Sequence, residues 1–580
     1  MARLLYLCVN KDKDLFLKLR NRSFDFLGEI QPKDVEVNEE IIFNSDNSLT
    51  VLVNPTRAVK VFNKNALIGL CYTEDKNEWL KMGKIPDGNF VIKREEDNTV
   101  EVVTDYQATK SLWYYFDNNK LIVSSSQRMI IHLLGIFELN EQAVMWMLSS
   151  GTLGYKNSWD KRIKSVPPAC ILKLNRDSWR IDLRISPVVF EPNNLSLKEN
   201  IKEFNEIVDK VFSHIDLKDI NPILSITGGY DSRAVFLHLK KYYPNLDLIT
   251  FGDKDSIKIK HSDLYCAKAI ANKCGLKWTL FDTNINIDDY DGYFTQMLQL
   301  GEGRIDLLER ITDNFFWIKS LFSNGYDVLF NGMEGFSCQY PYDNVKLNLL
   351  LRKLYLLEDF HNVDINLNIN QQYHEDLKKN DSESYNQHYY KINQLFFNPY
   401  GDSALNEIQN CYFDVINPLL AKSIIEFIRK LPDRQRVGKK IQRKWVREID
   451  KSNVPFAGCV SVIDTRDILK IRNIAEYINN YLIENNDIFP QKDIRSLNQQ
   501  TKLDLVDNHQ DLRKKNINNI KGNIKEFFFD EFPLLARKLR EYKHLHQEFI
   551  LDPHLLRYRM FIVVKMTNQL ENDANHGKQS

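Results

Sequence analysis

The sequence predicts an α/β protein with two folded parts, and three observations lead to this expectation. The first 190 residues are rich in short β-branched and aromatic runs separated by Asn, Asp and Gly, a pattern typical of antiparallel sheets. From about residue 200, apolar strand patterns alternate with helical ones, which indicates a parallel sheet covered by helices. With 580 residues, the chain is too long for one ordinary domain.

The first part, residues 1–193, is expected to form a β-rich α+β sandwich. The segment 88–106, GNFVIKREEDNTVEVVTDY, has β-rich runs on both sides of a Glu-Asp-Asn tip and predicts a hairpin. The segment 169–184, ACILKLNRDSWRIDLR, predicts a second hairpin. The polar stretch 191–200, EPNNLSLKEN, is expected to link this part to the next.

The second part, residues 194–570, is expected to be a parallel-sheet domain with a helical C-terminal portion. It opens with apolar residues at helical spacing over 201–212. Strand and helix patterns alternate after that, and helical patterns dominate from about residue 345, for example over 344–360 and 422–431. The polar residues 571–580 are expected to form a flexible tail.

Composition argues against several functional classes. Lys+Arg and Asp+Glu both number 78, and a zero net charge argues against nucleic-acid binding through a broadly basic surface. No run of about 18 apolar residues is present, so no membrane span is expected. The eight cysteines form no C-x-x-C pair, which predicts reduced thiols in a cytoplasmic protein rather than a structural metal site.

The segment 221–239, NPILSITGGYDSRAVFLHL, carries the most informative pattern. An apolar strand runs into Gly228 and Gly229, and a helix follows at once. Adjacent glycines permit a tight turn with uncovered N–H groups, which together with the start of a helix form a cradle for an anion. The alternative is a plain strand-to-helix turn that uses two glycines.

Polar side chains of the same turn point to phosphate chemistry. Thr227 and Ser232 supply hydroxyl groups. The Asp231 carboxylate would repel a phosphate unless Mg²⁺ lay between them. The turn lacks the G-x-x-x-x-G-K-[ST] pattern, so transfer of a γ-phosphate is not indicated.

The segment LSITGGYDSR resembles the S-G-G-x-D-S pyrophosphate loop of the asparagine synthetase-like family, in the ATP-pyrophosphatase (PP-loop) superfamily with lasso-peptide and β-lactam-forming cyclases. Further segments resemble the same family: YDVLFNGMEG resembles its strand ending in G-x-G-x-D-E, and 418–449 resembles a later segment, with Lys444 and Arg447 at its lysine and arginine positions. The resemblance spans nearly the whole chain and implies a PP-loop synthetase domain over 194–570.

Residues 104–126, TDYQATKSLWYYFDNNKLIVSSS, resemble the glutaminase domain of the same enzymes, which implies an Ntn-hydrolase-like sandwich over 1–193. The family's glutaminase uses a cysteine directly after the initiator methionine, where its free α-amine assists the thiolate. Here Ala2 stands at that position, and Cys8 lies inside the apolar run LLYLCV, where a buried side chain is expected. We therefore expect a degenerate class II glutamine amidotransferase-like domain without a glutaminase nucleophile.

The resemblance implies that ATP adenylates a carboxylate and releases pyrophosphate, after which a nitrogen nucleophile attacks the acyl-adenylate. Asp231 would bind Mg²⁺, and the catalytic candidates are Asp231, Glu334 and Lys444. Gly332 would approach the α-phosphate or the activated acyl group through its backbone. The expected ATP- and pyrophosphate-binding residues are Leu224, Ser225, Thr227, Gly228, Gly229, Tyr230, Asp231, Ser232, Thr250, Phe251 and Gly332.

Two departures from the family pattern stand out. Where the family reads G-E-G-x-D-E, residues 332–337 read GMEGFS, which keeps Glu334 in a shifted register and lacks the second acid. The stretch 454–467 has no lysine where the family places one that neutralises pyrophosphate, and Lys439, Lys440 or Arg466 are the alternatives. Residues 301–304, with Asp306, are further candidates for a substrate pocket.

The expected function is that of a cytoplasmic, ATP- and Mg²⁺-dependent ligase that forms an amide bond. Its partners would be a small-molecule or peptide carboxylate and either ammonia or an amine, with a homodimer compatible with the resemblance and neither nucleic acid nor membrane involved. One alternative is a non-catalytic nucleotide-binding or regulatory member of the family. Another is a complete glutamine-dependent asparagine synthetase, for asparagine biosynthesis, against which Ala2 argues.

Overall fold

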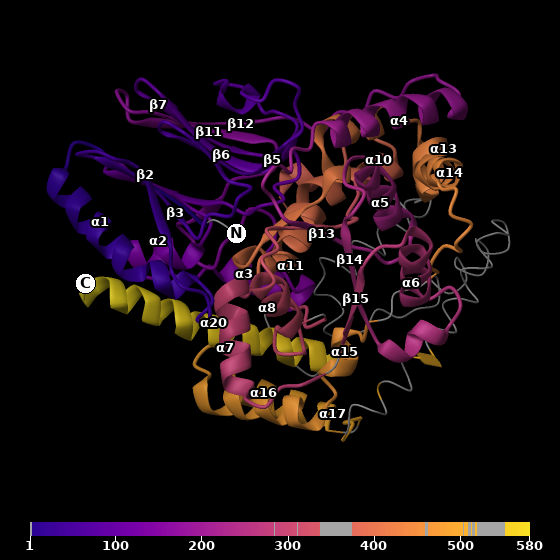
Figure 1. Ribbon diagram of the computed structural model, residues 1–580. Coiled ribbons are helices and arrows are strands. Elements are labelled where there is room, and N and C mark those ends of the chain that lie inside the picture. The colour runs from indigo at the N-terminus through magenta and orange to yellow at the C-terminus, as the bar shows by residue number, and fades with distance from the viewer. Residues whose placement is uncertain are drawn as a thin grey trace.

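The computed structural model describes residues 3–283, 285–309, 311–336, 374–458, 462–502, 504–507, 512, 517–518 and 552–579. Antiparallel sheets form the N-terminal part and a parallel sheet forms the later part (Figure 1), which confirms the expected α/β class at this level. Within these ranges, no helix is both long and apolar enough to cross a bilayer. Ala2 and the helix expected over 344–360 lie outside the described residues.

Two six-stranded antiparallel sheets make up the N-terminal part, in the orders β10-β8-β9-β1-β3-β2 and β12-β11-β7-β6-β5-β4. They share one apolar core, to which β1 contributes Leu4, Tyr6 and Cys8. The strands are β1 (Arg3–Val9), β2 (Glu39–Asn44), β3 (Ser48–Val53), β4 (Lys60–Phe62), β5 (Asn65–Cys71), β6 (Gly88–Glu96), β7 (Thr99–Thr104), β8 (Trp113–Phe116), β9 (Lys120–Ser124), β10 (Lys164–Ser165), β11 (Cys170–Asn175) and β12 (Arg180–Ile185).

Both hairpins expected from the sequence are confirmed. Strands β6 and β7 pair antiparallel up to Glu96 and Thr99, and Asp97 at the tip has a φ of 48°. Strands β11 and β12 pair antiparallel from Cys170–Ile185 to Asn175–Arg180. The β-branched runs and the turn residues were sufficient to predict these elements because the paired strands are neighbours in sequence.

Helices cover the other face of the first sheet. Leu5, Leu7 and Val9 alternate with the β1 residues of the inter-sheet core and join a second core beneath these helices, as the twofold periodicity of a strand requires. The helices of this layer are α1 (Lys13–Phe26), α2 (Gln127–Leu134) and α3 (Glu141–Ser150).

The later part is built on a five-stranded parallel sheet in the order β15-β14-β13-β16-β17. Its strands are β13 (Pro222–Ser225), β14 (Asp247–Gly252), β15 (Trp278–Asp282), β16 (Val328–Phe330) and β17 (Asp414–Ile416). Strand β17 was not predicted from the sequence; its three residues pair in parallel with β16.

Helices pack on both faces of this sheet. Leu224 of β13 belongs to the core with α4, α5, α6, α12 and α14, whereas its neighbour Ile223 belongs to the core with α7 and α8. The helices are α4 (Leu197–Ser213), α5 (Tyr230–Tyr242), α6 (Asp263–Cys274), α7 (Tyr290–Gly301), α8 (Phe316–Ser323), α10 (Tyr385–Ile392), α11 (Ser403–Leu405), α12 (Lys422–Arg429), α13 (Asp433–Arg436), α14 (Lys440–Ile449), α15 (Thr465–Ile468), α16 (Arg472–Asn485) and α17 (Gln491–Thr501).

The last helix, α20 (Pro553–Gln579), joins the two parts (Figure 1, yellow). The flexible tail expected over 571–580 is not seen, because residues 571–579 complete this helix. Asp573 accepts a hydrogen bond from the Arg128 Nε atom at 2.8 Å. A Cβ atom on Gly577 would lie 2.0 Å from the His132 carbonyl oxygen, so α20 approaches α2 as closely as a glycine allows. The polar composition of 571–580 did not indicate a helix, since the ordering of these residues depends on contacts with α2.

Candidate functional site

The loop over 227–232 lies at the carboxyl end of the central strand of the parallel sheet. From β13 the chain passes to β14 and β15 on one side, and later returns to β16 and β17 on the other side. The direction of strand order therefore reverses beside β13. In open α/β sheets, ligands bind in the crevice outside the carboxyl ends of the strands at such a switch point.

Gly228 and Gly229 have different roles in this loop. Gly228 has a φ of 71°, and a Cβ atom there would lie 2.3 Å from the Cys266 Cβ atom. Gly229 has a φ of −69°, and a Cβ atom there would meet only the Thr227 Oγ1 atom, at 3.5 Å. The loop is thus tightly packed next to Gly228, whereas the space next to Gly229 is open.

The loop presents polar hydrogens at the start of α5. The Thr227 amide donates to the Ser232 Oγ atom at 3.1 Å, and the two hydroxyl oxygens lie 3.0 Å apart. In the described structure, no side chain caps the N-terminus of α5, although the first amides of a helix lack intrahelical partners. This arrangement suits an anion, because free N–H groups and the helix dipole both attract negative charge.

Four of the expected ATP-binding residues, Leu224, Ser225, Thr250 and Phe251, belong to β13 and β14. The Thr250 hydroxyl donates to the Ile226 carbonyl at 2.6 Å and accepts from the Trp278 Nε1 atom at 2.9 Å. Leu224, Ser225 and Phe251 are buried. The structure therefore places this set next to the loop, with the Thr250 hydroxyl engaged in holding the two strand ends together.

The turn after β16 brings a second acid to the loop. A Cβ atom on Gly332 would lie 2.5 Å from the Ser232 amide nitrogen, so this turn approaches the first turn of α5 closely. Glu334 follows, and its Oε2 atom accepts a hydrogen bond from the Phe336 amide. The close approach allows Asp231 and Glu334 to share one partner.

That partner is Lys439. Its Nζ atom lies 2.7 Å from the Glu334 Oε1 atom and 3.3 Å from the Asp231 Oδ2 atom. The Lys439 and Glu334 side chains are only 12% and 7% exposed. The Gln442 Nε2 atom donates to the Asp231 Oδ1 atom at 2.8 Å. Two of the three catalytic candidates, Asp231 and Glu334, are therefore brought together by a lysine.

Burial and charge shift the pKa values of this group. Burial raises the pKa of the Asp231 carboxyl, and the Glu334 charge adds to this effect although Lys439 opposes it. Burial lowers the pKa of Lys439, but attraction by Glu334 and Asp231 outweighs it, so that pKa is raised. Lys439 therefore remains a cation throughout the physiological pH range.

The third candidate, Lys444, lies elsewhere on α14. Its side chain is exposed, and its position two residues after Gln442 places it about 200° around the helix. Arg447 does reach the loop, since its Nε atom donates to the Tyr230 hydroxyl at 2.9 Å. Of the other cations considered, Lys440 is exposed and Arg466 pairs with Asp464 at 2.9 Å.

The segment 454–458 packs against the loop. Its Ala457 amide donates to the Gly228 carbonyl at 3.1 Å. The Phe456 ring stacks on Tyr230 with centroids 4.1 Å apart, and the Arg233 guanidinium lies 4.0 Å from the Phe456 centroid. Sequence reasoning missed Phe456 and Gln442, although Gln442 lies one helical turn after Lys439, a spacing that could have revealed it.

The donor set fits a magnesium ion that is held together with a phosphate ligand. Among the described residues, no group of three or more His, Cys, Asp and Glu side chains could hold a metal by itself. Mg²⁺, however, is usually held by one or two carboxylates together with phosphate oxygens and water. Asp231 and Glu334 supply two carboxylates beside the open loop, and they are the residues that would hold it.

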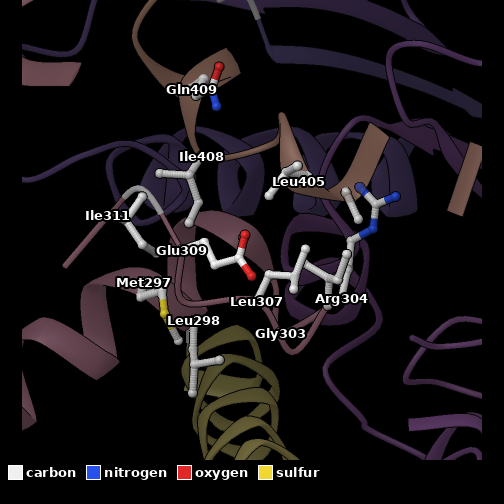
Figure 2. Close-up of a pocket in the computed structure, with 13 residues that line it drawn as sticks. Met297, Leu298, Gly303, Arg304, Leu307, Glu309, Ile311, Leu405, Ile408 and Gln409 are labelled. Atoms are coloured by element: carbon white, nitrogen blue, oxygen red, sulfur yellow. The ribbon is translucent and has the colours of Figure 1, made fainter. Parts of the chain in front are cut away.

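The segment 301–304, a further candidate for a substrate pocket, lines a small cavity. Gly301, Gly303 and Arg304 line a cavity of about 30 Å³ with α7 and α11 residues, including Met297 and Leu405 (Figure 2). Such a volume holds one or two water molecules, so the cavity does not admit an acyl substrate in this conformation.

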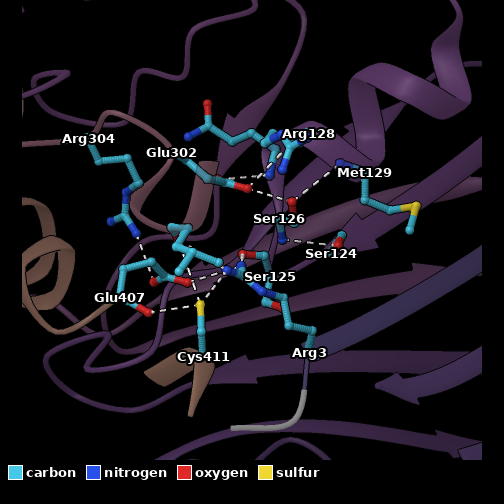
Figure 3. Close-up of polar contacts among 12 residues, drawn as sticks. Arg3, Ser124, Ser125, Ser126, Arg128, Met129, Glu302, Arg304, Glu407 and Cys411 are labelled. Carbon is cyan, nitrogen blue, oxygen red and sulfur yellow. Dashed lines mark hydrogen bonds and ion pairs between the residues drawn. The ribbon is translucent and has the colours of Figure 1, made fainter. Parts of the chain in front are cut away.

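The acidic and basic side chains of this segment connect the two parts of the protein (Figure 3). Glu407 accepts hydrogen bonds from Arg3 and Arg304, each at 3.1 Å. Glu302 accepts from the Ser126 hydroxyl, at 2.5 Å, at the start of α2. The Asp306 amide donates to the Gly151 carbonyl at 3.0 Å. These buried contacts make 301–306 part of the joint between the N-terminal sheets and the later part.

Cys8 lies in the centre of the first sheet, where β1 pairs with both β3 and β9. It is fully buried, and burial raises the pKa of its thiol. A thiol in this position is neither accessible to glutamine nor readily ionised.

Compared with models of known protein families and with curated proteins, the chain matches none of them.

Proposed function

We propose that this protein is an ATP-dependent ligase that forms amide bonds in the manner of asparagine synthetases. It adenylates a carboxylate, and ammonia or an amine then displaces AMP. The observation that supports this most is the loop 227–232 itself. It lies at the switch point of a parallel sheet, opens in front of Gly229 and starts an uncapped helix next to two carboxylates.

The loop residues account for binding of the nucleotide's β- and γ-phosphates. The first amides of α5 and the hydroxyls of Thr227 and Ser232 can donate to phosphate oxygens. A Mg²⁺ ion held by Asp231 and Glu334 would neutralise charge on those oxygens. Lys439 is close enough to both acids to add a further positive charge at the same place.

The proposed reaction needs no reactant other than ATP, the carboxylate and the nitrogen donor. A carboxylate oxygen of the substrate bonds to the α-phosphorus while the bond from that phosphorus to pyrophosphate breaks. The nitrogen of ammonia or an amine then bonds to the acyl carbon, the bond to AMP breaks, and the nitrogen loses a proton. The protein contributes by orienting the groups and stabilising charge on the departing phosphates.

The nitrogen donor is free ammonia or an amine on a second substrate. The buried thiol of Cys8 supports this choice, because glutamine hydrolysis needs an accessible nucleophile. Glutamine as sole nitrogen source is therefore expected to support no reaction. Activity with glutamine that is lost in Cys8→Ser would contradict the donor assignment.

The direct test is release of pyrophosphate and AMP from ATP and Mg²⁺ with a panel of amino-acid and peptide carboxylates, each with ammonium or a primary amine. Asp231→Asn is expected to abolish release, whereas Asp381→Asn, which changes an exposed carboxylate, is expected to leave it unchanged. Release that survives Asp231→Asn would contradict the proposed site.

One observation favours a second candidate, a nucleotide-binding member without catalysis. The second acid of the family pattern is absent, and Lys439 already pairs with both Glu334 and Asp231. This candidate predicts ATP binding with no pyrophosphate release for any carboxylate, so the same assay separates the two.

A further inference from the structure

The backbone around Lys439 is unusual. Gly438 and Lys439 both have positive φ values, 73° and 52°, between α13 and α14. Glycine adopts this conformation freely, but a lysine there is strained by its Cβ atom. Strain of this kind persists where the surrounding structure requires it, often at functional sites. Here it accompanies a side chain directed back to the loop.

The Lys439 ammonium lies between two carboxylates from separate segments. Asp231 comes from the first turn of α5 and Glu334 from the turn after β16. The second oxygen of each carboxylate is held independently, by the Gln442 amide group and by the Phe336 backbone amide. The carboxylates are therefore positioned without relying on Lys439 alone.

A polar atom next to this group is left without a partner. Gln442 is 1% exposed, and its Oε1 atom has no hydrogen-bond partner within the described structure. A buried acceptor of this kind is costly unless a ligand or an ordered water donates to it. The Gln442 amide thus has its Nε2 atom on Asp231 and, within the described structure, an Oε1 atom that can accept from a ligand or a water.

We propose that the Lys439 ammonium takes the place of the divalent cation in the ligand-free site and moves to phosphate oxygens when the nucleotide binds. This inference rests on the proposed function. An ammonium between two carboxylates excludes a second cation by like-charge repulsion. The divalent cation consequently enters only with a ligand that carries pyrophosphate, because that ligand offers Lys439 another anion.

The test measures metal binding rather than turnover. Mn²⁺ serves as the probe, through its effect on water-proton relaxation, with and without inorganic pyrophosphate. The wild type is expected to bind Mn²⁺ at least ten-fold more tightly when pyrophosphate is present. Lys439→Met is expected to bind Mn²⁺ alone at least ten-fold more tightly than the wild type. Lys440→Met removes the neighbouring exposed lysine and is expected to match the wild type.

Two results would overturn the inference. One is a wild-type protein that binds Mn²⁺ alone as tightly as with pyrophosphate, a result that needs no variant. The other is an unchanged Mn²⁺ affinity in Lys439→Met protein that circular dichroism shows to be folded. If the methionine variant does not fold, Lys439→Gln is used in its place. Wild-type protein that fails to bind Mn²⁺ with pyrophosphate would instead contradict the proposed function.

Discussion

Two adjacent glycines offer a matched pair of substitutions, because alanine meets different surroundings at each. At Gly228 it would adopt a φ of 71° and place its Cβ atom 2.3 Å from the Cys266 Cβ atom. The left-handed conformation costs about 1–2 kcal/mol and overpacking about 1–3 kcal/mol. The sum is about 2–5 kcal/mol, so the thermal midpoint of Gly228→Ala should fall by about 2–4 °C for a chain of 580 residues.

At Gly229, alanine is compatible with the fold. The φ of −69° is ordinary, and the Cβ atom would meet only the Thr227 Oγ1 atom, at 3.5 Å. Stability should therefore change by less than about 1 kcal/mol. The new methyl group projects into the space proposed for a phosphate oxygen. Loss of one charge-assisted hydrogen bond there corresponds to about 1.5–3 kcal/mol, or at least about ten-fold weaker binding of Mg²⁺-pyrophosphate.

Scanning calorimetry measures the first effect and titration calorimetry the second. The reasoning would be refuted by folded Gly229→Ala protein that binds Mg²⁺-pyrophosphate as tightly as the wild type. A wild-type thermal midpoint for Gly228→Ala would refute the close contact with Cys266.

Three further predictions concern stability and local order. Lys110→Met leaves the Asp414 carboxylate buried without the ammonium 2.5 Å from it, so unfolding should cost about 3–5 kcal/mol less by calorimetry, with partial recovery in Lys110→Met/Asp414→Asn. Burial lowers the pKa of His238 to about 4, and the nearby Lys241 also lowers it whereas Asp209 raises it. The unfolded state therefore binds more protons, so up to about 3 kcal/mol of stability should be lost as the pH falls from 6.5 to 4. His238→Gln should not show this loss. Phe456→Ala removes contacts with Tyr230 and Arg233 worth about 1–2 kcal/mol, so hydrogen exchange over 454–458 should be about ten-fold faster, and unchanged exchange would show that the stack does not hold this segment.

Sequence patterns predicted the elements whose information is local. The hairpins of β6–β7 and β11–β12 follow from β-rich runs and turn residues, and strands β13 to β16 from short apolar runs between helical segments. The end of α20 could not be predicted in this way, because its order depends on α2, which precedes it by more than 400 residues.

The position of the loop in the candidate site was predicted from the sequence, but its contacts with distant residues were not. The strand-to-helix position of the loop 227–232 is readable from the sequence, because the strand, glycines and helix are contiguous. The contact of Lys439 with Asp231 and Glu334 is not readable, since it depends on two consecutive positive φ values before α14. The family resemblance favoured Lys444 instead, which the structure places on the exposed side of α14.

Titration calorimetry of ATP into the protein, with and without Mg²⁺, examines the nucleotide site most directly. The proposed function predicts binding that depends on Mg²⁺ and is lost in Asp231→Asn, with the variant's thermal midpoint close to that of the wild type. Absence of Mg²⁺-dependent ATP binding by the folded wild-type protein would contradict it.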